Sequence, residues 1–413
     1  MKCWRPFVFL SAAICGIVFF GLAIQDVFAG TPGDQRTARR SFLQSTLGVR
    51  GNFELYVPQD QAITHYWRYN DVPWFPWFAA TDKLVYPCAT GSTCPRPRSI
   101  TLIQSSFTGN FEAIVRVAPA QPTDPDYLDV WSLDASWQWK GPFPLVADGQ
   151  PVTGVTGDPV LIQSTWGIKG NFEVFVPQGN VIGHYFRDND SPGFPWHIAG
   201  DRFGYACPPK PCYTPRGLSL IQSSYKGDGT HANFEDVVRV RGLLGEPEHL
   251  DMWYLDSGTW IWHGPFPLVA DGQLVSNVTG DPVLIQSKVP LLGAARFADN
   301  FEVYVPQGDM IRHYYRDNND PLLPWHVGID SFGYPCPSTA RCPTPRGLTL
   351  IQSNFLGNGV AGNFEAVVRV SPSLAIEPDH LDFWYFDTNT MRWSGPMPIV
   401  VGGQPVYTSS GLD

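Results

Sequence analysis

One short motif, Asn-Phe-Glu preceded at a short distance by Gln-Ser, recurs six times in the chain of 413 residues. Its glutamates are Glu54, Glu112, Glu173, Glu235, Glu302 and Glu365, which are 58, 61, 62, 67 and 63 residues apart. A segment that recurs at such a period forms one supersecondary unit, and neighbouring units stack to bury a shared core. The sequence therefore predicts a repeat protein.

The six repeats alternate between two kinds. The odd-numbered repeats, over about 41–98, 159–216 and 282–346, carry His-Tyr-x-Arg, then Pro-Trp, then two cysteines. The even-numbered repeats, over about 99–158, 217–281 and 347–411, carry Leu-Asp-x-Trp and then a Trp close to Gly-Pro-x-Pro. We expect one domain over 41–413, built from three pairs of repeats and preceded by a short segment, 30–40.

Each repeat is expected to hold four strands and no helix. In the third repeat, apolar segments separated by turn residues indicate strands over about 160–164, 172–177, 181–188 and 196–203. The fourth repeat gives 218–223, 234–240, 250–255 and 259–263. The first two strands of a repeat are apolar on both faces, so both faces must be covered.

A radial arrangement covers both faces, because each sheet is then packed between its two neighbours. The predicted fold class is all-β, a β-propeller with six four-stranded blades in three alternating pairs. A β-helix needs shorter rungs, and a β-sandwich does not explain six regular repeats. The ring is expected to close by packing alone or through an outer strand from 30–40.

The first 29 residues have the pattern of a secretory signal peptide. Lys2 and Arg5 precede an apolar run that ends near Ala29, and such a pattern predicts a secreted or periplasmic protein. An uncleaved anchor is the alternative, since the run is about as long as the shortest membrane span. The whole chain has 28 Lys and Arg against 38 Asp and Glu and carries no basic stripe, which argues against nucleic acid as a partner.

Six of the eight cysteines lie in pairs at the same point of the odd-numbered repeats. The pairs are Cys88–Cys94, Cys207–Cys212 and Cys336–Cys342, whereas Cys3 and Cys15 fall in the leader. Three local disulfides are predicted, as suits an oxidising compartment. No second pair or His couple lies nearby at zinc-ligand spacing, so no metal site is expected there.

The His-Tyr-x-Arg segments are the strongest candidates for a ligand site. They supply Arg68, His184, Arg187, His313 and Arg316. Three interpretations are open. The first is a structural tie between Glu and Arg, such as Glu173 with Arg187 across a hairpin. The second is sugar binding at repeated sites, and the third is a lyase site in which Tyr or His acts as base beside Arg. Three copies favour binding over catalysis, because avidity gains from multiplicity.

The turn that follows each segment adds further candidates. Asp188 and Asp317 are the first residues of Asx-rich turns. Such turns either bind calcium or only accept hydrogen bonds from their own backbone N–H groups. Trp196 and Trp325 come next and are suited to stack on a sugar or to fill the gap between blades. No cofactor is expected apart from the calcium alternative.

The repeats resemble the secreted β-propeller lectins of bacteria and fungi, many of which bind fucose or related sugars. The shared pattern is a short apolar strand, a Gly-Asn-Phe-Glu-like strand, a strand ending in an aromatic-basic group and a Trp-rich last strand, over most of 41–411. The Pro-Trp and cysteine loops have no match in those lectins. The resemblance implies a propeller that binds glycans.

The leading hypothesis is a secreted, non-catalytic, lectin-like propeller with repeated glycan sites. A polysaccharide lyase or glycoside hydrolase is the first alternative, with its site where the repeats differ. Those differences are Phe78 against His197 and His326, Asp236 against Ala113 and Ala366, His231, His263 and the insertion 289–298. A protein-binding scaffold is the second alternative.

Overall fold

The computed structural model describes residues 41–88, 93–207, 212–225, 227–243, 245–287, 300–336, 342–355, 362–373 and 377–408. The predicted signal peptide (1–29), the segment 30–40 and the insertion 289–298 lie outside the described residues. The chain divides into two compact units, 1–34 and 35–413, and every described residue belongs to the second. Within the described ranges all regular structure is β, and no helix is present that could cross a membrane.

Each odd-numbered repeat forms an antiparallel meander. The first consists of β1 (Phe42–Gln44), β2 (Phe53–Gln59), β3 (Ala62–Arg68) and β4 (Trp77–Val85). The third consists of β11 (Val160–Gln163), β12 (Phe172–Gln178), β13 (Val181–Arg187), β14 (Trp196–Ile198) and β15 (Phe203–Gly204). The fifth consists of β22 (Val283–Ser287), β23 (Asn300–Gln307), β24 (Met310–Arg316), β25 (Trp325–Val327) and β26 (Phe332–Gly333).

Each even-numbered repeat forms a meander of four unbroken strands. These are β5 (Arg96–Gln104), β6 (Phe111–Ala118), β7 (Tyr127–Leu133) and β8 (Trp139–Pro144) in the second repeat. The fourth has β16 (Thr214–Gln222), β17 (Phe234–Arg241), β18 (His249–Asp256) and β19 (Ile261–Pro267). The sixth has β27 (Thr344–Gln352), β28 (Phe364–Ser371), β29 (His380–Asp387) and β30 (Arg392–Pro398).

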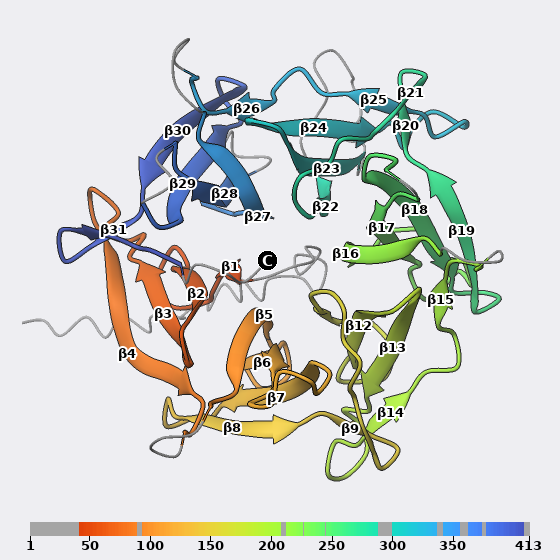
Figure 1. Cartoon of the computed structure of the whole chain (residues 1–413), viewed down its shortest axis with the longest axis horizontal. Helices are drawn as coiled ribbons and strands as arrows, with labels where there is room; N and C mark the ends of the chain where they lie inside the picture. Colours follow the sequence, from red (N-terminus) through yellow and green to blue (C-terminus); the bar gives the residue numbers. More distant parts are fainter. Residues whose placement is uncertain are drawn as a thin grey trace, which may run out of the picture. The chain divides into compact units, whose positions relative to one another are not determined.

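The meanders of residues 41–408 are arranged as a β-propeller, with β1, β5, β16 and β27 among the strands near the centre (Figure 1). The predicted all-β class and the β-propeller are thereby confirmed, whereas the number of six four-stranded blades stays a prediction. The expected last strand of the third repeat, 196–203, is wrong as a single strand, because residues 199–202 leave the ladder between β14 and β15. This bend matters for the site, since it carries Asp201 toward β13.

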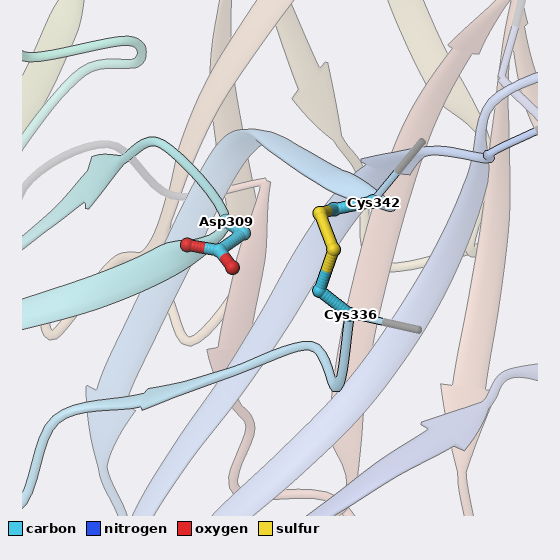
Figure 2. A group of neighbouring side chains, drawn as sticks. All are labelled: Asp309, Cys336 and Cys342. Carbon is cyan, nitrogen blue, oxygen red and sulfur yellow. A yellow bond between two sulfur atoms is a disulfide. The ribbon is translucent and has the colours of Figure 1, made fainter. Parts of the chain in front are cut away.

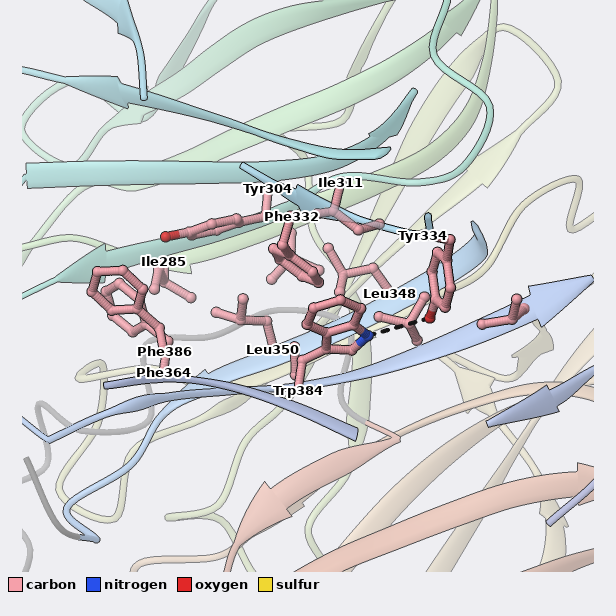
Figure 3. Close-up of a cluster of buried hydrophobic side chains, with 14 residues drawn as sticks. Ile285, Tyr304, Ile311, Phe332, Tyr334, Leu348, Leu350, Phe364, Trp384 and Phe386 are labelled. Carbon is pink, nitrogen blue, oxygen red and sulfur yellow. Dashed lines mark hydrogen bonds between the residues drawn. The ribbon is translucent and has the colours of Figure 1, made fainter. Parts of the chain in front are cut away.

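The core is divided among the interfaces between neighbouring meanders. In the interface of the fifth and sixth repeats, Tyr304 and Phe332 of one sheet pack against Phe364 and Trp384 of the next (Figure 3). The indole of Trp384 donates a hydrogen bond to the hydroxyl of Tyr334 at 3.3 Å. Both faces of each inner strand are thus buried, as the apolar runs in the sequence predict.

Three short hairpins were not expected from the sequence. They follow the even-numbered meanders and are β9 (Val146–Ala147) with β10 (Gln150–Pro151), β20 (Val269–Ala270) with β21 (Gln273–Leu274), and β31 (Val400–Val401) with β32 (Gln404–Pro405). Ala147 pairs in parallel with Trp196, and Ala270 pairs with Trp325, so two of the hairpins tie their sheet to the next one.

The ring closes by side-chain packing between the sixth and first repeats. Phe53 lies 6.0 Å from Phe355 and 6.4 Å from Phe383, measured between ring centroids. Gln44 also accepts a hydrogen bond from the backbone N–H of Asn354 at 2.9 Å. No strand is exchanged between the first and sixth repeats within the described ranges.

We predict that Phe175→Ala lowers the free energy of unfolding by about 3–5 kcal/mol. Phe175 is fully buried between the third and fourth repeats, against Phe234 and Trp262, so its loss leaves a cavity. Chemical denaturation measures the effect. Phe143→Ala is the matched control, because Phe143 is 56% exposed and should cost less than about 1 kcal/mol. Equal losses from the two changes would contradict the interface.

Candidate functional site in the central cavity

The glutamate of each odd-numbered repeat belongs to a buried chain of hydrogen bonds. Ser164 donates to Oε1 of Glu173 at 2.7 Å, and Oε2 of Glu173 lies 3.0 Å from Nε2 of His184. Nδ1 of His184 lies 2.6 Å from Oδ1 of Asp201, whose other oxygen accepts from Trp262 of the fourth repeat at 3.2 Å. The same chain recurs as Glu54–His65–Asp82–Trp139 and Glu302–His313–Asp330–Trp393.

The three histidines are held in the charged form. Burial by itself lowers the pKa of His184, but the hydrogen bonds to Asp201 and Glu173 outweigh it and raise the pKa to about 9. The pKa of His313 is likewise raised to about 9 and that of His65 to about 8. His184 is only 3% exposed, so this network joins sheets rather than facing a ligand.

The arginines of His-Tyr-x-Arg tie each odd-numbered repeat to the repeat before it. Arg187 donates to Glu112 of the second repeat at 3.4 Å, and its guanidinium lies 4.0 Å from the ring centroid of Phe172. The expected pairing of Arg187 with Glu173 is wrong, because the register places Phe172 opposite Arg187 and leaves Glu173 to His184.

The other two arginines occupy the same place. Arg316 lies 4.0 Å from Glu235, and Arg68 stacks on Phe53 at 4.1 Å and interacts electrostatically with Glu365. Burial raises the pKa of Glu235 to about 7 and of Glu365 to about 8, although the arginines oppose the shift. Arg68, Arg187 and Arg316 are buried, and their contacts favour the structural interpretation. Sugar binding by these residues stays a prediction.

The turn residues and tryptophans of the same segment also have partners. Asp188 accepts from the backbone N–H of Asp190 at 2.9 Å and of Ser191 at 3.2 Å, and Asp317 accepts from that of Asn319 at 2.9 Å. These are Asx turns, the alternative to calcium that the sequence left open. Trp196 and Trp325 are half-buried and pack on the cores between sheets.

The three predicted disulfides are confirmed: Cys88–Cys94, Cys207–Cys212 and Cys336–Cys342. Asp309 lies beside Cys336 and Cys342, and the three together resemble a set of metal ligands (Figure 2). The two sulfurs are bonded to each other, however, and a metal requires free thiolates. This group is therefore structural.

A cavity of about 970 Å³ lies among the strands nearest the centre of the propeller. Its lining includes two arginines from each even-numbered repeat, which come from equivalent positions. The pairs are Arg98 with Arg116, Arg216 with Arg239, and Arg346 with Arg369. Five carboxylates, Asp124, Asp126, Asp158, Glu248 and Asp281, share the lining.

A local irregularity of the innermost strand places the first arginine of each pair. The ladder shifts register between Pro97 and Ser99, between Pro215 and Gly217, and between Pro345 and Gly347, so the arginine between them sits at a bulge. A bulge redirects the side chain of its extra residue. The residue after the bulge lies opposite the second arginine, as Gly217 lies opposite Arg239.

Carboxylates hold most of these arginines in place. Arg98 lies 3.1 Å and Arg116 2.7 Å from Oδ2 of Asp126, and Arg116 is also 3.3 Å from Asp158. Arg239 lies 2.8 Å from Asp281 and 3.4 Å from Glu248, and Arg369 lies 3.1 Å from Asp379. Arg216 and Arg346 form no ion pair with another described residue. Fixed donors and acceptors of this kind suit a polar ligand with many hydroxyl groups.

None of the six cavity arginines is among the candidates named from the sequence. The signal for Arg116, Arg239 and Arg369 is their fixed position four residues after the glutamate of each even-numbered repeat. The signal for Arg98, Arg216 and Arg346 is a threefold Pro-Arg followed by Ser or Gly, just after the cysteine loop. This signal is easily overlooked, because the cysteines already account for that stretch.

The residues that differ between repeats do not gather at this cavity. His197 pairs with Asp148 at 2.7 Å and His326 with Asp271 at 2.8 Å, on the hairpins between sheets. His231 pairs with Asp228 at 2.6 Å, and His263 stacks on Tyr254. None of the four lines the cavity.

Asp236 is a different case, because it is fully buried in the interface of the third and fourth repeats. Neither oxygen forms a hydrogen bond of ordinary geometry with a described residue. Burial raises the pKa of Asp236 well above its usual value, and the backbone N–H groups of Ser219 and Val237 offset this only in part. The equivalent positions hold Ala113 and Ala366.

No protein-family model and no curated protein matches the sequence. Several solved structures share the fold. An α-L-arabinanase from Penicillium chrysogenum, complexed with arabinobiose, is 12% identical with a TM-score of 0.51, over 87% of this chain and 94% of that one. An α-L-arabinofuranosidase from Fusarium graminearum is 10% identical with a TM-score of 0.46, over 85% and 99%. An ulvan lyase is 10% identical with a TM-score of 0.41, over 88% and 85%.

The likeness to the arabinanase supports the class of protein, a β-propeller, and at this identity it shows the fold alone. The lectin-like pattern expected from the sequence stays a prediction.

We predict that the stability contributed by His184 is lost at alkaline pH. The folded-state pKa of about 9 exceeds the ordinary value of 6.5, so the contribution is complete below about pH 6.5 and disappears as pH rises through 9. In urea titrations, His184→Gln should cost roughly 1–3 kcal/mol more at pH 6 than at pH 9.5. The control is His197→Gln on β14, where the histidine is partly exposed and contacts Asp148 of the hairpin. A cost for His184→Gln that does not change with pH would disprove a charged His184.

We predict that Asp236→Ala raises the free energy of unfolding by about 1–3 kcal/mol at pH 7, because it removes a buried carboxyl group without good partners. The folded-state pKa lies above the ordinary one, so folding becomes less favourable as pH rises above about 4, and the gain from the variant should grow with pH. Ala113→Asp is the reciprocal control: it should lower the free energy of unfolding, and the loss should grow as the pH rises. Loss of stability in Asp236→Ala would mean that the carboxyl group has a partner.

Proposed function

We propose that the protein is a secreted carbohydrate-binding propeller whose saccharide lies in the central cavity. The observation that carries this proposal is the set of arginines from the three even-numbered repeats, held by carboxylates around one space of about 970 Å³. Arginine and carboxylate side chains bind sugar hydroxyls from fixed positions, and a preformed cavity binds without the cost of ordering loops. The three disulfides support secretion.

One central site replaces three peripheral ones in this proposal. Arg187 and its two counterparts are buried and already paired or stacked, so a sugar at these positions would have to break contacts between sheets. The cavity arginines border open space instead. The α-L-arabinanase that shares this fold was solved with arabinobiose, so a propeller of this size can accommodate a saccharide.

A carbohydrate-active enzyme is the second candidate, and the single large cavity favours it, because one central site is what a catalyst needs. Glycoside hydrolysis requires a protonated carboxyl group next to a carboxylate. Asp126, Asp158, Glu248 and Asp281 each form an ion pair with an arginine. The paired acids therefore support binding more directly than hydrolysis.

The experiment is a glycan array on the mature protein, followed by calorimetric titration of the best ligand. We expect one saccharide per chain. Arg216→Gln should lower the affinity about tenfold or more. This variant breaks no ion pair with a described residue, so the fold should be preserved. Arg187→Gln should lower the melting temperature and leave affinity nearly unchanged. Three saccharides per chain, with graded loss from changes at Arg68, Arg187 and Arg316, would instead establish the repeated sites.

Catalysis is tested on the same ligand. The bound polysaccharide is incubated with the protein, and new reducing ends and unsaturated products are measured over time. Products that disappear in Arg216→Gln would make the cavity an active site, whereas binding without products would leave a lectin.

A further inference from the structure

Highly exposed apolar side chains stand in turns of all three odd-numbered repeats. In the first repeat, Val49 and Trp74 are both 94% exposed. Ile168 of the third repeat is 97% exposed, and Leu322 of the fifth is 87% exposed. Single apolar residues on a surface are ordinary, whereas a set of them at repeated positions indicates a contact with a partner. We call these four side chains the apolar tips.

The turns that carry the apolar tips leave their sheets at one end. In the first sheet, the residues that begin or finish the strands at this end pair in a single row, which consists of Gln44, Phe53, Arg68 and Trp77. Both connections beyond this row, 45–52 and 69–76, therefore lie at the same end. The third and fifth sheets have the equivalent row.

Hydrogen bonds between neighbouring repeats show that these ends share one face of the ring. The backbone N–H of Thr46 in the first repeat donates to Oε1 of Gln104 in the second at 2.8 Å. Equivalent bonds join the second repeat to the third, the third to the fourth, the fourth to the fifth and the sixth to the first. The hydroxyl of Tyr225 in the fourth repeat also donates to the carbonyl of Asn318, in the turn that carries Leu322. The apolar tips thus surround one face of the propeller.

Carboxylates hold the tips in place. Asp71 accepts from the backbone N–H of Val49 at 2.7 Å and of Arg50 at 2.8 Å, which ties the two turns of the first repeat together. Asp190 holds the turns of the third repeat in the same way, with bonds of 2.6 and 3.1 Å. Trp74 has a φ of 74°, which is unfavourable for a bulky residue. Packing does not explain a strained side chain that stays in water, and such strain is typical of functional positions.

The charge of these turns indicates which kind of surface they meet. Four bases and six aspartates occur in the six connections at this end of the odd-numbered repeats, which are 45–52, 69–76, 164–171, 188–195, 288–299 and 317–324. The bases are Arg50, Lys169, Lys288 and Arg296, and the aspartates are Asp71, Asp188, Asp190, Asp299, Asp317 and Asp320. An acidic excess does not favour an anionic surface, so apolar contact must supply the attraction.

We propose that this face binds a lipid membrane with electrically neutral headgroups, such as phosphatidylcholine, and inserts its apolar tips at the boundary of headgroups and acyl chains. The tips come from sheets in three separate sectors of the ring (Figure 1). Separated tips suit a broad, deformable partner, whereas a protein partner requires a continuous apolar core.

The residue types of the tips favour lipid over the flat surface of an insoluble polysaccharide. Val49, Ile168 and Leu322 are aliphatic and suit acyl chains, and Trp74 suits the headgroup level. A polysaccharide surface would require a flat aromatic ring at every tip. The sequence predicts no membrane contact beyond the leader, because each of these residues stands in a short turn and only the ring brings them to one face.

The inference goes beyond the saccharide site and does not depend on it. Arg98, Arg216 and Arg346 of the cavity lie near the beginning of β5, β16 and β27, whereas the apolar tips stand at the end of the sheets where these strands finish. A propeller bound through its tips would therefore keep the cavity arginines on the side away from the membrane.

The test measures flotation of the mature protein with phosphatidylcholine vesicles. Binding should persist at about 1 M salt, because salt screens charges and does not weaken apolar insertion. Trp74→Ser, Ile168→Ser and Leu322→Ser should each lower the partition coefficient about tenfold, and the triple variant should not bind. Ile329→Ser is the matched control, since Ile329 is 92% exposed but lies between β25 and β26, beside the middle of β24.

A fluorescent label tests whether the three sectors insert together. Val49→Cys, Ile168→Cys and Leu322→Cys are each labelled with an environment-sensitive fluorophore, and Ile329→Cys serves as the control. On addition of vesicles, the emission of the first three should shift to shorter wavelength and become shielded from an aqueous quencher, whereas that of the control should not change. Insertion at a single position would overturn the contact through three sectors.

Other results would also overturn the proposal. These are no binding to vesicles, binding that the tip variants do not change, and binding that requires anionic lipid and disappears at high salt. A dimer that Ile168→Ser dissociates, in the absence of vesicle binding, would make this face an interface between two copies of the chain. Sedimentation with crystalline cellulose without vesicle binding would make it a polysaccharide surface. Saccharide affinity of the cavity should be equal in all tip variants, so failure of this inference is distinct from failure of the proposed function.

Discussion

Burial of both faces of every sheet is the constraint on which the rest of this structure depends. Strands such as β12, with Val174, Phe175 and Val176 all buried, cannot leave either face in water. A ring of sheets satisfies this requirement for all repeats at once, since each interface serves two neighbours. The interface between the sixth and first repeats, where Phe53 meets Phe355 and Phe383, completes the ring without a covalent or backbone link among the described strands.

Polar ties cross these apolar interfaces in an alternating order. Where an odd-numbered repeat meets the following even one, the tie is the charged histidine between two carboxylates, and a tryptophan of the next sheet donates to the aspartate. Where an even-numbered repeat meets the following odd one, the tie is arginine with glutamate. A buried charge is tolerated only with its partner, so each tie fixes which sheets can be neighbours. Asp236 departs from this rule, since it is buried where the other repeats have alanine.

The cavity inherits the threefold symmetry of the repeat pairs. Asp158 and Asp281 come from the start of the next repeat and pair with Arg116 and Arg239. Arg369 of the sixth repeat is held by Asp379.

The sequence by itself determined the repeat, the two kinds of unit, the absence of helices in the described part and the three disulfides. It could do so because these features depend on local residue types and on their period. It left open a structural tie between the glutamate and the arginine of an odd-numbered repeat, but it paired the wrong residues. Glu173 and Arg187 belong to one hairpin in sequence, whereas the register turns Arg187 toward Glu112 of the preceding sheet.

Only the tertiary structure brought the cavity arginines together. Arg98, Arg216 and Arg346 lie far apart in the sequence, and they share one cavity because bulges at equivalent points of three inner strands place them there. Such contacts between distant segments are fixed by the closed ring rather than by local pattern.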